Sequence, residues 1–346
     1  MAPIIRVHEG DRDPDFGIIR KQIKVSNLPS FETPTKCLKN LYHSFPSTLN
    51  INEVTKRIYP ETIESIMDGT HAGPRKTIWP RFLKNRLNLT IFELRFDSVP
   101  SRDEIKSLAS YWYAASEYTL FLPTVKMAML KEGRKFSDKR MSQYLGMMQY
   151  MIEVTEAIGN TKSFIGTIPL IPIKYAKPLI RLYHEKYITA FAIDGGTKDF
   201  LNHETDFRSI LIEINEEVPL NKALVYACNL GIPQFEAHKA RADDFLSFFA
   251  YVDAFGTTFK TRGGPRMRRT PPRVKKFLRD ELSYEYVQGD RRHLLDFNQH
   301  EQLKEADAVR TLIGEEKMQT YLDGKSAVDS FAKKRLDSIA KKVQIS

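Results

Sequence analysis

The chain has 346 residues, of which 42% are hydrophobic and 28% charged, a balance that allows a sizeable core and excludes a disordered polar chain. Its two cysteines, Cys37 and Cys228, are far apart, which excludes a disulfide framework and a zinc site built on cysteines. The net charge of +10 favours a polyanionic partner such as nucleic acid. Neither a signal-peptide core nor a run of about 18 apolar residues occurs, so we expect a soluble, cytoplasmic protein without a membrane partner.

Residues 1–88 are polar and rich in turn formers, which predicts an N-terminal extension of short strands and loops. From residue 89 the chain alternates between strand and helix patterns. Strands are predicted at 89–96, 118–125, 163–171, 188–194, 222–229 and 251–259. Helices are predicted at 101–117, 138–160, 173–187, 204–217 and 242–250. Ser101 and Glu104 form a capping box at the start of the first of these helices, and Gly159-Asn160 ends the second.

The spacing of these strands predicts an α/β fold. Strand starts recur every 25 to 35 residues or so, which is about the length of one βα repeat, and the strands are apolar on both faces as buried parallel strands are. Such repeats form either an open doubly wound sheet or a closed barrel. We favour a (β/α)8 TIM-like barrel, in which residues 1–88 supply the missing strands and 89–262 form the main βα units. A basic linker at 263–280 and C-terminal helices at 281–346 complete the predicted organisation.

Three aspartates occur at or within predicted strands. Asp97 and Asp194 follow strands and Asp253 lies within the last one. Because active sites of parallel barrels form at the carboxyl ends of strands, these carboxylates are candidates for a nucleophile or a general base in one cavity. Each could equally cap a helix or a turn.

Small and amide residues follow the same strands and could contact a flat ligand. Gly195 and Gly196 follow Asp194 and would let a planar base approach backbone amides, and Asn229 and Gly231 follow the next strand. Asp-Gly is also a common turn dipeptide.

A run of cations without any acid follows residue 259. A dense run of like charge calls for a counter-charge, which phosphates would supply, although a solvated loop is the alternative reading. The candidate nucleic-acid-binding residues are Lys260, Arg262, Arg266, Arg268, Arg269, Arg273, Lys275 and Lys276.

The signatures of several common sites are absent from the sequence. It contains no Walker A, GxGxxG, HExxH or GxSxG pattern. His293 and His300 lie seven apart in a helical segment without a nearby cysteine, so no metal ion and no other cofactor is predicted.

An ordered set of segments resembles the tRNA-guanine transglycosylase superfamily. "FETPTKCL" is similar to an N-terminal segment of that family, "FAIDGGTK" to its Gly-Gly base-binding loop, and "VYACNLGIPQF" to the segment that follows. "ADDFLSFFAYVDAFGTTFKTRGG" and "NQHEQLKEADAVRTLIGEEKMQTYL" are similar to later segments, so the likeness covers most of residues 160–330.

The resemblance implies a barrel that replaces guanine by a 7-deazaguanine in tRNA or, in one branch, in DNA. It implies one aspartate that attacks the sugar and another for acid/base work, which "RFDSVPS" matches loosely at Asp97. Two departures stand out: Gly256 occupies the position of the attacking aspartate, and the cysteines of the family's zinc site are missing.

Three hypotheses follow. The first is base exchange in tRNA or DNA, with Asp194 or Asp253 as nucleophile and a 7-deazaguanine as the incoming base. The second is an inactive nucleic-acid-binding subunit that pairs with a catalytic paralogue or with itself. The third is an unrelated barrel enzyme that acts on a phosphorylated small molecule.

Overall fold

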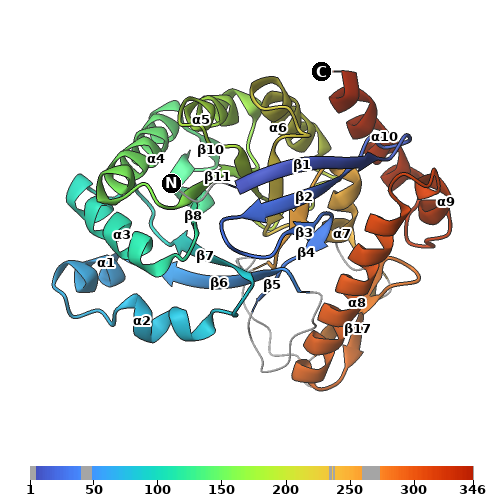
Figure 1. Ribbon diagram of the computed structural model, residues 1–346, viewed down its shortest axis with the longest axis horizontal. Coiled ribbons are helices and arrows are strands. Elements are labelled where there is room, and N and C mark those ends of the chain that lie inside the picture. The colour runs from blue at the N-terminus through green and yellow to red at the C-terminus, as the bar shows by residue number, and fades with distance from the viewer. Residues whose placement is uncertain (1–4, 40–48, 234–235, 237, 259–272, 346) are drawn as a thin grey trace.

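The computed structural model describes residues 5–39, 49–233, 236, 238–258 and 273–345. Its centre is a parallel sheet in which the strands follow the order β4-β15-β13-β12-β11-β8-β7-β6-β5. β4 and β5 are two short halves of one strand that is interrupted at Cys37, so the sheet has eight strands among the described residues. Because β4 pairs with β15 and β5 pairs with β6, the sheet is nearly closed into a barrel, consistent with a TIM-like barrel (Figure 1).

The strands of the barrel are β4 (Thr35–Lys36), β5 (Leu38–Lys39), β6 (Ile51–Ile58), β7 (Leu87–Leu94), β8 (Thr119–Val125), β11 (Ser163–Pro169), β12 (Ala190–Asp194), β13 (Leu224–Cys228) and β15 (Ala254–Phe255). The segments between them are α1 (Pro60–Met67), α2 (Pro74–Thr77), η1 (Trp79–Arg81), α3 (Arg102–Ala115), η2 (Met127–Leu130), the hairpin β9 (Lys131–Glu132) and β10 (Lys135–Phe136), α4 (Asp138–Ile158), α5 (Ile173–Glu185), α6 (Glu204–Glu217), α7 (Asp243–Leu246) and η3 (Ser247–Ala250).

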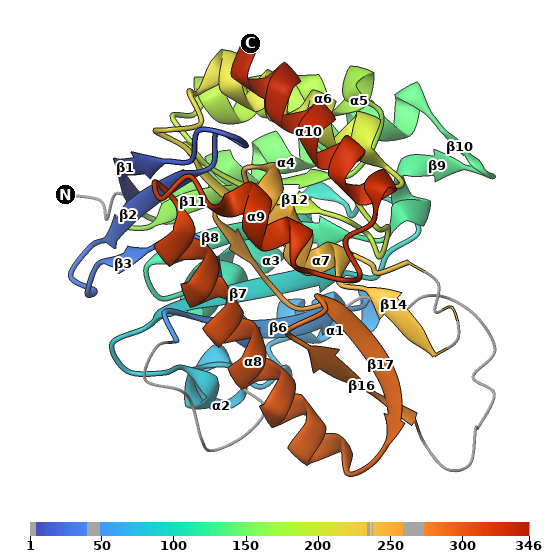
Figure 2. The same cartoon turned by 90° about the vertical axis from the view of Figure 1, so that its right-hand side faces the viewer.

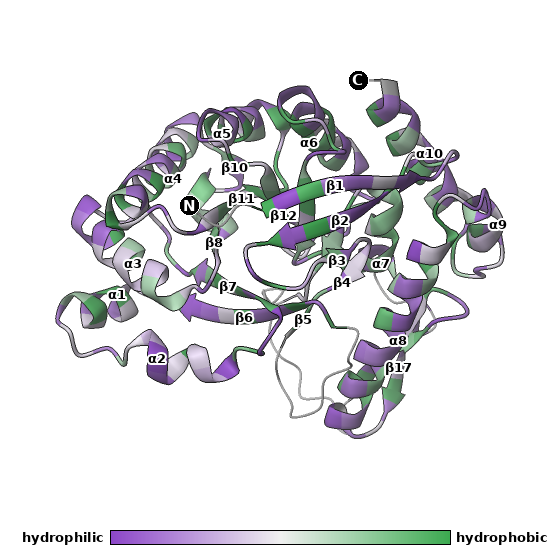
Figure 3. Ribbon diagram, in the orientation of Figure 1, coloured by the Kyte–Doolittle hydropathy of each residue, from purple (hydrophilic) through white to green (hydrophobic). Residues whose placement is uncertain are grey.

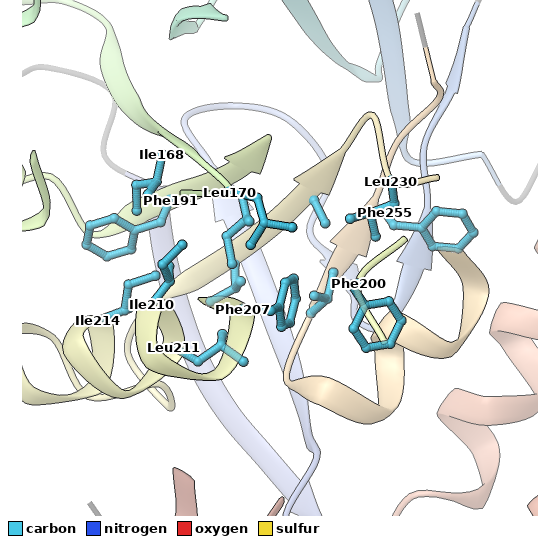
Figure 4. Packing of buried hydrophobic residues seen from close by; sticks show 14 of the residues in the cluster. Ile168, Leu170, Phe191, Phe200, Phe207, Ile210, Leu211, Ile214, Leu230 and Phe255 are labelled. Carbon is cyan, nitrogen blue, oxygen red and sulfur yellow. The ribbon is translucent and has the colours of Figure 1, made fainter. Parts of the chain in front are cut away.

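Helices cover the outer face of the barrel because each carries an apolar stripe. In α6 the side chains of Phe207, Ile210, Leu211 and Ile214 are buried, and Figure 4 shows them facing the strands beside Phe191. Figure 3 shows the same pattern, with hydrophobic strands inside and hydrophilic colour on the helices and at the tips of β6 and β7. Burial of apolar surface on both faces of the sheet makes the largest contribution to the stability of the fold.

The N-terminal extension closes the amino end of the barrel. β1 (Ile5–Arg12), β2 (Ile19–Val25) and β3 (Phe31–Glu32) form an antiparallel sheet that crosses the barrel in Figure 1. Ile23 and Val25 share one apolar cluster with Ile51 and Leu87, which are the first residues of β6 and β7. This contact places the extension beneath the strand starts and away from the strand ends.

The C-terminal part adds a small sheet and three helices. β14 (Lys239–Arg241), β17 (Ser283–Gln288) and β16 (Arg273–Leu278) form an antiparallel sheet, against which α8 (Arg291–Leu312) packs (Figure 2). The Asn298 amide on α8 donates to the carbonyl of Lys275 and accepts from the N–H of Phe277, which satisfies two backbone groups on the open edge of β16. α9 (Met318–Asp323) and α10 (Ser330–Ile345) follow, and α10 packs on α6.

The alternation of strands and helices from residue 89 onward agrees with the structure, including the Ser101 and Glu104 capping box and the stop at Gly159. As expected, residues 1–88 supply the missing barrel strands, which are β4 to β6. Within the described residues, the predicted strand at 251–259 is reduced to the two residues of β15. The predicted linker contains β16, and β17 precedes the predicted C-terminal helices. No helix in the described ranges is long and apolar enough to cross a membrane.

Candidate functional site

Of the three candidate aspartates, Asp194 lies inside the carboxyl end of the barrel. It is the last residue of β12, and it shares the inward face of that strand with Ala190 and Ala192. Its Oδ1 accepts hydrogen bonds from Asn229 Nδ2 at 2.9 Å and from the N–H of Gly196 at 3.1 Å. These bonds hold a buried carboxylate in one orientation at the barrel mouth.

Asp253 lies at the opposite end, so the expectation that it shares a cavity with Asp194 is wrong. It precedes β15, and its N–H bonds the carbonyl of Val225 near the start of β13, whereas Asp194 is level with Cys228 at the end of that strand. Its Oδ2 is 2.7 Å from Lys21 Nζ and 2.7 Å from the N–H of Val225. Burial raises the pKa of Asp253 and the Lys21 ammonium opposes that shift. The carboxylate therefore ties the N-terminal extension to the barrel.

Asp97 lies on the outer rim at the carboxyl end of β7. Its side chain is 79% exposed and pairs with Lys126 Nζ at 2.7 Å. An exposed carboxylate of this kind is well hydrated, and the surface pair adds little stability. Asp97 and Asp194 are thus at the same end of the barrel, but their environments are opposite.

A cationic rim, defined here as Arg57, Arg95, Lys126 and Lys198, follows the strand ends. Arg57 lies near the end of β6, Arg95 follows β7, and Lys126 follows β8. Glu93, which is only 1% exposed, pairs with both arginines, at 3.3 Å from Arg57 Nε and 2.9 Å from Arg95 Nη2. Arg57 and Lys126 remain 43% and 44% exposed. The four cations of the rim interact with three acids, since Glu93 and Asp97 pair with Arg57, Arg95 and Lys126, and Asp206 attracts Lys198.

The glycines after β12 have structural roles: Gly196 forms the turn that the Asp-Gly dipeptide allowed for, whereas the packing role of Gly195 was not foreseen. A Cβ on Gly195 would lie 2.9 Å from the carbonyl oxygen of Asn229, and Gly196 has a φ of +58°. The loop is further bonded to its neighbour through the N–H of Gly231, which donates to the carbonyl of Lys198 at 2.7 Å. Gly195 therefore permits close packing of two loops, and Gly196 permits a tight turn at Asp194.

Gly256 lies in the barrel interior beside Glu53, a residue that the sequence did not single out. A Cβ on Gly256 would overlap Glu53 Oε1 and the hydroxyl of Tyr226. Glu53 accepts a hydrogen bond from that hydroxyl, and its Oε2 accepts from the N–H of Thr257 at 2.9 Å. The space in which the family resemblance would put an attacking aspartate is therefore filled by a hydrogen-bonded glutamate from β6.

Most of the predicted basic segment, Lys260 to Arg269, lies outside the described residues, and the side chain of Arg273 does too. Lys275 and Lys276 are on β16 and lie over the rings of Tyr284 and Phe297, at 5.8 and 5.3 Å from the ring centroids. These two lysines are in the C-terminal sheet and not in a linker.

Glu53 and Arg57 were missed because the polar residues of β6 interrupt its apolar pattern. Glu93 and Arg95 lie within the predicted strand 89–96, where nothing in the local pattern marks them as site residues. Lys198 is held by its bond to the carbonyl of Leu170 at 2.8 Å, and burial lowers its pKa. Among the described residues, no group of three or more His, Cys, Asp or Glu side chains is placed to hold a metal ion.

No protein-family model matches the sequence, and a comparison with curated proteins gives no significant match.

Proposed function

We propose that the chain binds a nucleic acid across the carboxyl end of the barrel and acts as the non-catalytic subunit of a transglycosylase-type assembly. The observation that carries this proposal is the cationic rim. Arg57 lies near the end of β6, Arg95 and Lys126 follow β7 and β8, and Lys198 lies in the loop after β12. Arg57 and Lys126 are substantially exposed. Such an arc suits the evenly spaced charges of a phosphate backbone.

The environment of the candidate nucleophiles supports binding over base exchange. Asp253 belongs to a buried ion pair at the amino end, and a side chain at position 256 would collide with Glu53 and Tyr226. A nucleophile must reach the sugar carbon of a nucleotide, and neither position offers a carboxylate at the mouth.

The second candidate function is base exchange by this chain alone, within a complete (β/α)8 barrel. The position of the Asp194 carboxylate at the carboxyl end of the barrel favours it. Its carboxylate is oriented by Asn229 and the N–H of Gly196, as an acid/base group or a nucleophile has to be. Such a reaction would take a 7-deazaguanine as the incoming base, on the resemblance noted above.

The experiment compares binding with exchange. Fluorescently labelled tRNA and duplex DNA are titrated with the wild-type chain and with Lys126→Glu, a reversal at an exposed rim position. Lys222→Glu is the matched control, because Lys222 is exposed and lies two residues before β13 at the amino end. We expect Lys126→Glu to weaken binding about tenfold and Lys222→Glu to leave it unchanged. Equal effects of the two reversals would contradict the proposal.

Incorporation of radiolabelled guanine into tRNA and DNA by the purified chain separates the two candidates. We expect none. Incorporation that Asp194→Asn abolishes, while binding persists, would overturn the non-catalytic assignment and establish the second candidate.

A further inference from the structure

A second hollow lies on the outside of the barrel at its amino end, away from the cationic rim. It has a volume of about 900 Å³ and is lined by residues 70–76, Trp79, Tyr113, Ala114 and Lys162. Trp79 precedes β7, Tyr113 lies in the last turn of α3 before β8, and Lys162 directly precedes β11. Because these residues lie just before strands, the amino-end hollow is at the opposite end of the barrel from the cationic rim. Its volume is in the range of pockets that hold small ligands.

The charge of the amino-end hollow is positive. Arg75, Lys76 and Lys162 line it, and no carboxylate is among its lining residues. Arg75 and Lys76 are exposed and have no ion pair within the described ranges of the chain. Lys162 is attracted electrostatically by Glu117, which does not line the hollow and whose Oε2 accepts from Asn88 at 2.8 Å. The hollow therefore presents cations without acidic partners in its wall.

Lys162 is held in place by backbone groups. Its ammonium donates to the carbonyls of Tyr113 and Ser116, the latter at 2.7 Å, and lies 4.0 Å from the centroid of the Tyr113 ring. Burial lowers its pKa to about 8. An ammonium has three N–H donors and two have partners among the described residues, so an anion in the hollow can accept from the third.

An aromatic surface accompanies these cations. Trp79 is 43% exposed, and its indole N–H bonds the carbonyl of Ala114 at 3.2 Å, which fixes the plane of the ring. The Arg75 guanidinium lies 5.4 Å from the centroid of that ring. A phosphate held by Arg75 would thus bring a planar group bonded to it next to the indole.

His71 adds a donor to the same wall. Its Nε2 is 2.7 Å from Lys56 Nζ, and an ammonium only donates, so Nε2 accepts and the ring hydrogen is on Nδ1. Burial and the Lys56 charge lower the pKa of His71, which keeps the ring neutral.

We propose that the amino-end hollow binds a nucleotide unit, with its phosphate on Arg75, Lys76 and Lys162 and its base against Trp79. Arg75, Lys76 and Lys162 select the anion, because no carboxylate lines the hollow with them, and the fixed indole selects a flat ring. The nucleotide can be free or part of a single strand, since both present the same phosphate and base. The proposal is independent of the function assigned to the barrel mouth.

Intrinsic fluorescence tests this proposal directly. The chain has two tryptophans, and Trp112 is fully buried, so a change on ligand addition reports Trp79. The probes are guanosine 5′-monophosphate, guanosine, inorganic phosphate and a single-stranded oligonucleotide. We expect quenching by the monophosphate at concentrations below about 1 mM, and binding at least about tenfold weaker for guanosine.

The variant is Arg75→Glu with Lys76→Glu, because both side chains are exposed, and its melting temperature is measured alongside binding to confirm that it folds. We expect it to weaken binding at least about tenfold, whereas Lys222→Glu, the distant control, has no effect. Calorimetry on Trp79→Ala should show a similar loss. A monophosphate that binds more tightly than the oligonucleotide identifies a free nucleotide, and the reverse order identifies a strand.

Absence of quenching, equal affinity for guanosine and its monophosphate, or unchanged binding by the double reversal would each overturn the proposal. If the amino-end hollow does not bind a nucleotide, the effect of Lys126→Glu on tRNA or DNA binding is still a valid test of the cationic rim. The two proposals can therefore be refuted separately.

Discussion

Replacing Asp253 by alanine should destabilise the fold rather than remove a reactive group. Asp253 and Lys21 are 4% and 3% exposed, and the carboxylate also accepts from the N–H of Val225. Alanine would remove the carboxylate that pairs with the buried Lys21 ammonium. Among the described residues, Lys21 would keep its bond to the carbonyl of Ala223 at 2.9 Å and its longer-range attraction to Glu9. Breaking a buried pair from one side costs about 3–5 kcal/mol.

This cost corresponds to a measurable change in melting temperature. At about 2.1 cal/mol/K per residue, unfolding of 346 residues has an entropy of about 0.7 kcal/mol/K, so Tm should fall by about 4–7 °C. Thermal and urea denaturation of Asp253→Ala would measure the change. Lys21→Met with Asp253→Leu is the matched control, because removing both charges should recover most of the loss.

Two results would refute this reasoning. The first is a Tm of Asp253→Ala within about 1 °C of the wild type, since the buried charge would then cost far less than a broken pair does. The second is a variant of normal stability that has lost nucleic-acid binding or base incorporation, which would make Asp253 a functional group.

Three further predictions concern the interior, pH and salt. Gly256→Ala should lower the free energy of unfolding by about 1–3 kcal/mol, because the added methyl group displaces Glu53 and Tyr226. The control, Gly146→Ala on an open face of α4, should be neutral or stabilising. Equal urea midpoints for the two variants would contradict this prediction. Burial raises the pKa of Asp243 to about 8 although the ion pair with Arg241 opposes the shift, so the native state binds this proton more tightly than the unfolded chain, which loses it above about pH 4. Stability should therefore fall as pH rises from about 4 to 8, by at most about 1.4 kcal/mol per unit, and an identical Tm-versus-pH slope in Asp243→Asn would refute the assignment. For three phosphate contacts at the cationic rim, affinity for tRNA or DNA should fall about 40-fold between about 50 and 200 mM salt, and a salt-independent affinity would exclude phosphate recognition.

The order of strands and helices after residue 89 could be predicted because it depends on local pattern. Apolar runs such as 89–96 are too short for helices and rich in β-formers, and the Ser101 capping box is contained within four residues. β6 escaped prediction because Asn52, Glu53 and Lys56 interrupt its apolar pattern. Their partners are Asn88, Tyr226 and Tyr111, from distant parts of the chain.

In the candidate site, too, features set by local sequence could be predicted, whereas features set by distant residues could not. That Asp194 ends a buried strand could be read from "AFAIDGG", since the run of apolar residues stops there. The sequence could not show at which end of the barrel Asp253 lies, because β15 is only two residues long and the aspartate precedes it. The reason for Gly195 is equally non-local, since the atom that excludes a side chain there is the carbonyl oxygen of Asn229.

The sequence by itself determined a chain of βα units with a positive net charge, because hydrophobic periodicity and charge are properties of neighbouring residues. Only the tertiary structure decided which polar groups meet. The N-terminal extension brings Lys21 to Asp253, and β6 brings Glu53 to Gly256. Burial of such groups costs free energy unless a partner from another part of the chain satisfies them, and that partner is specified by the closure of the barrel.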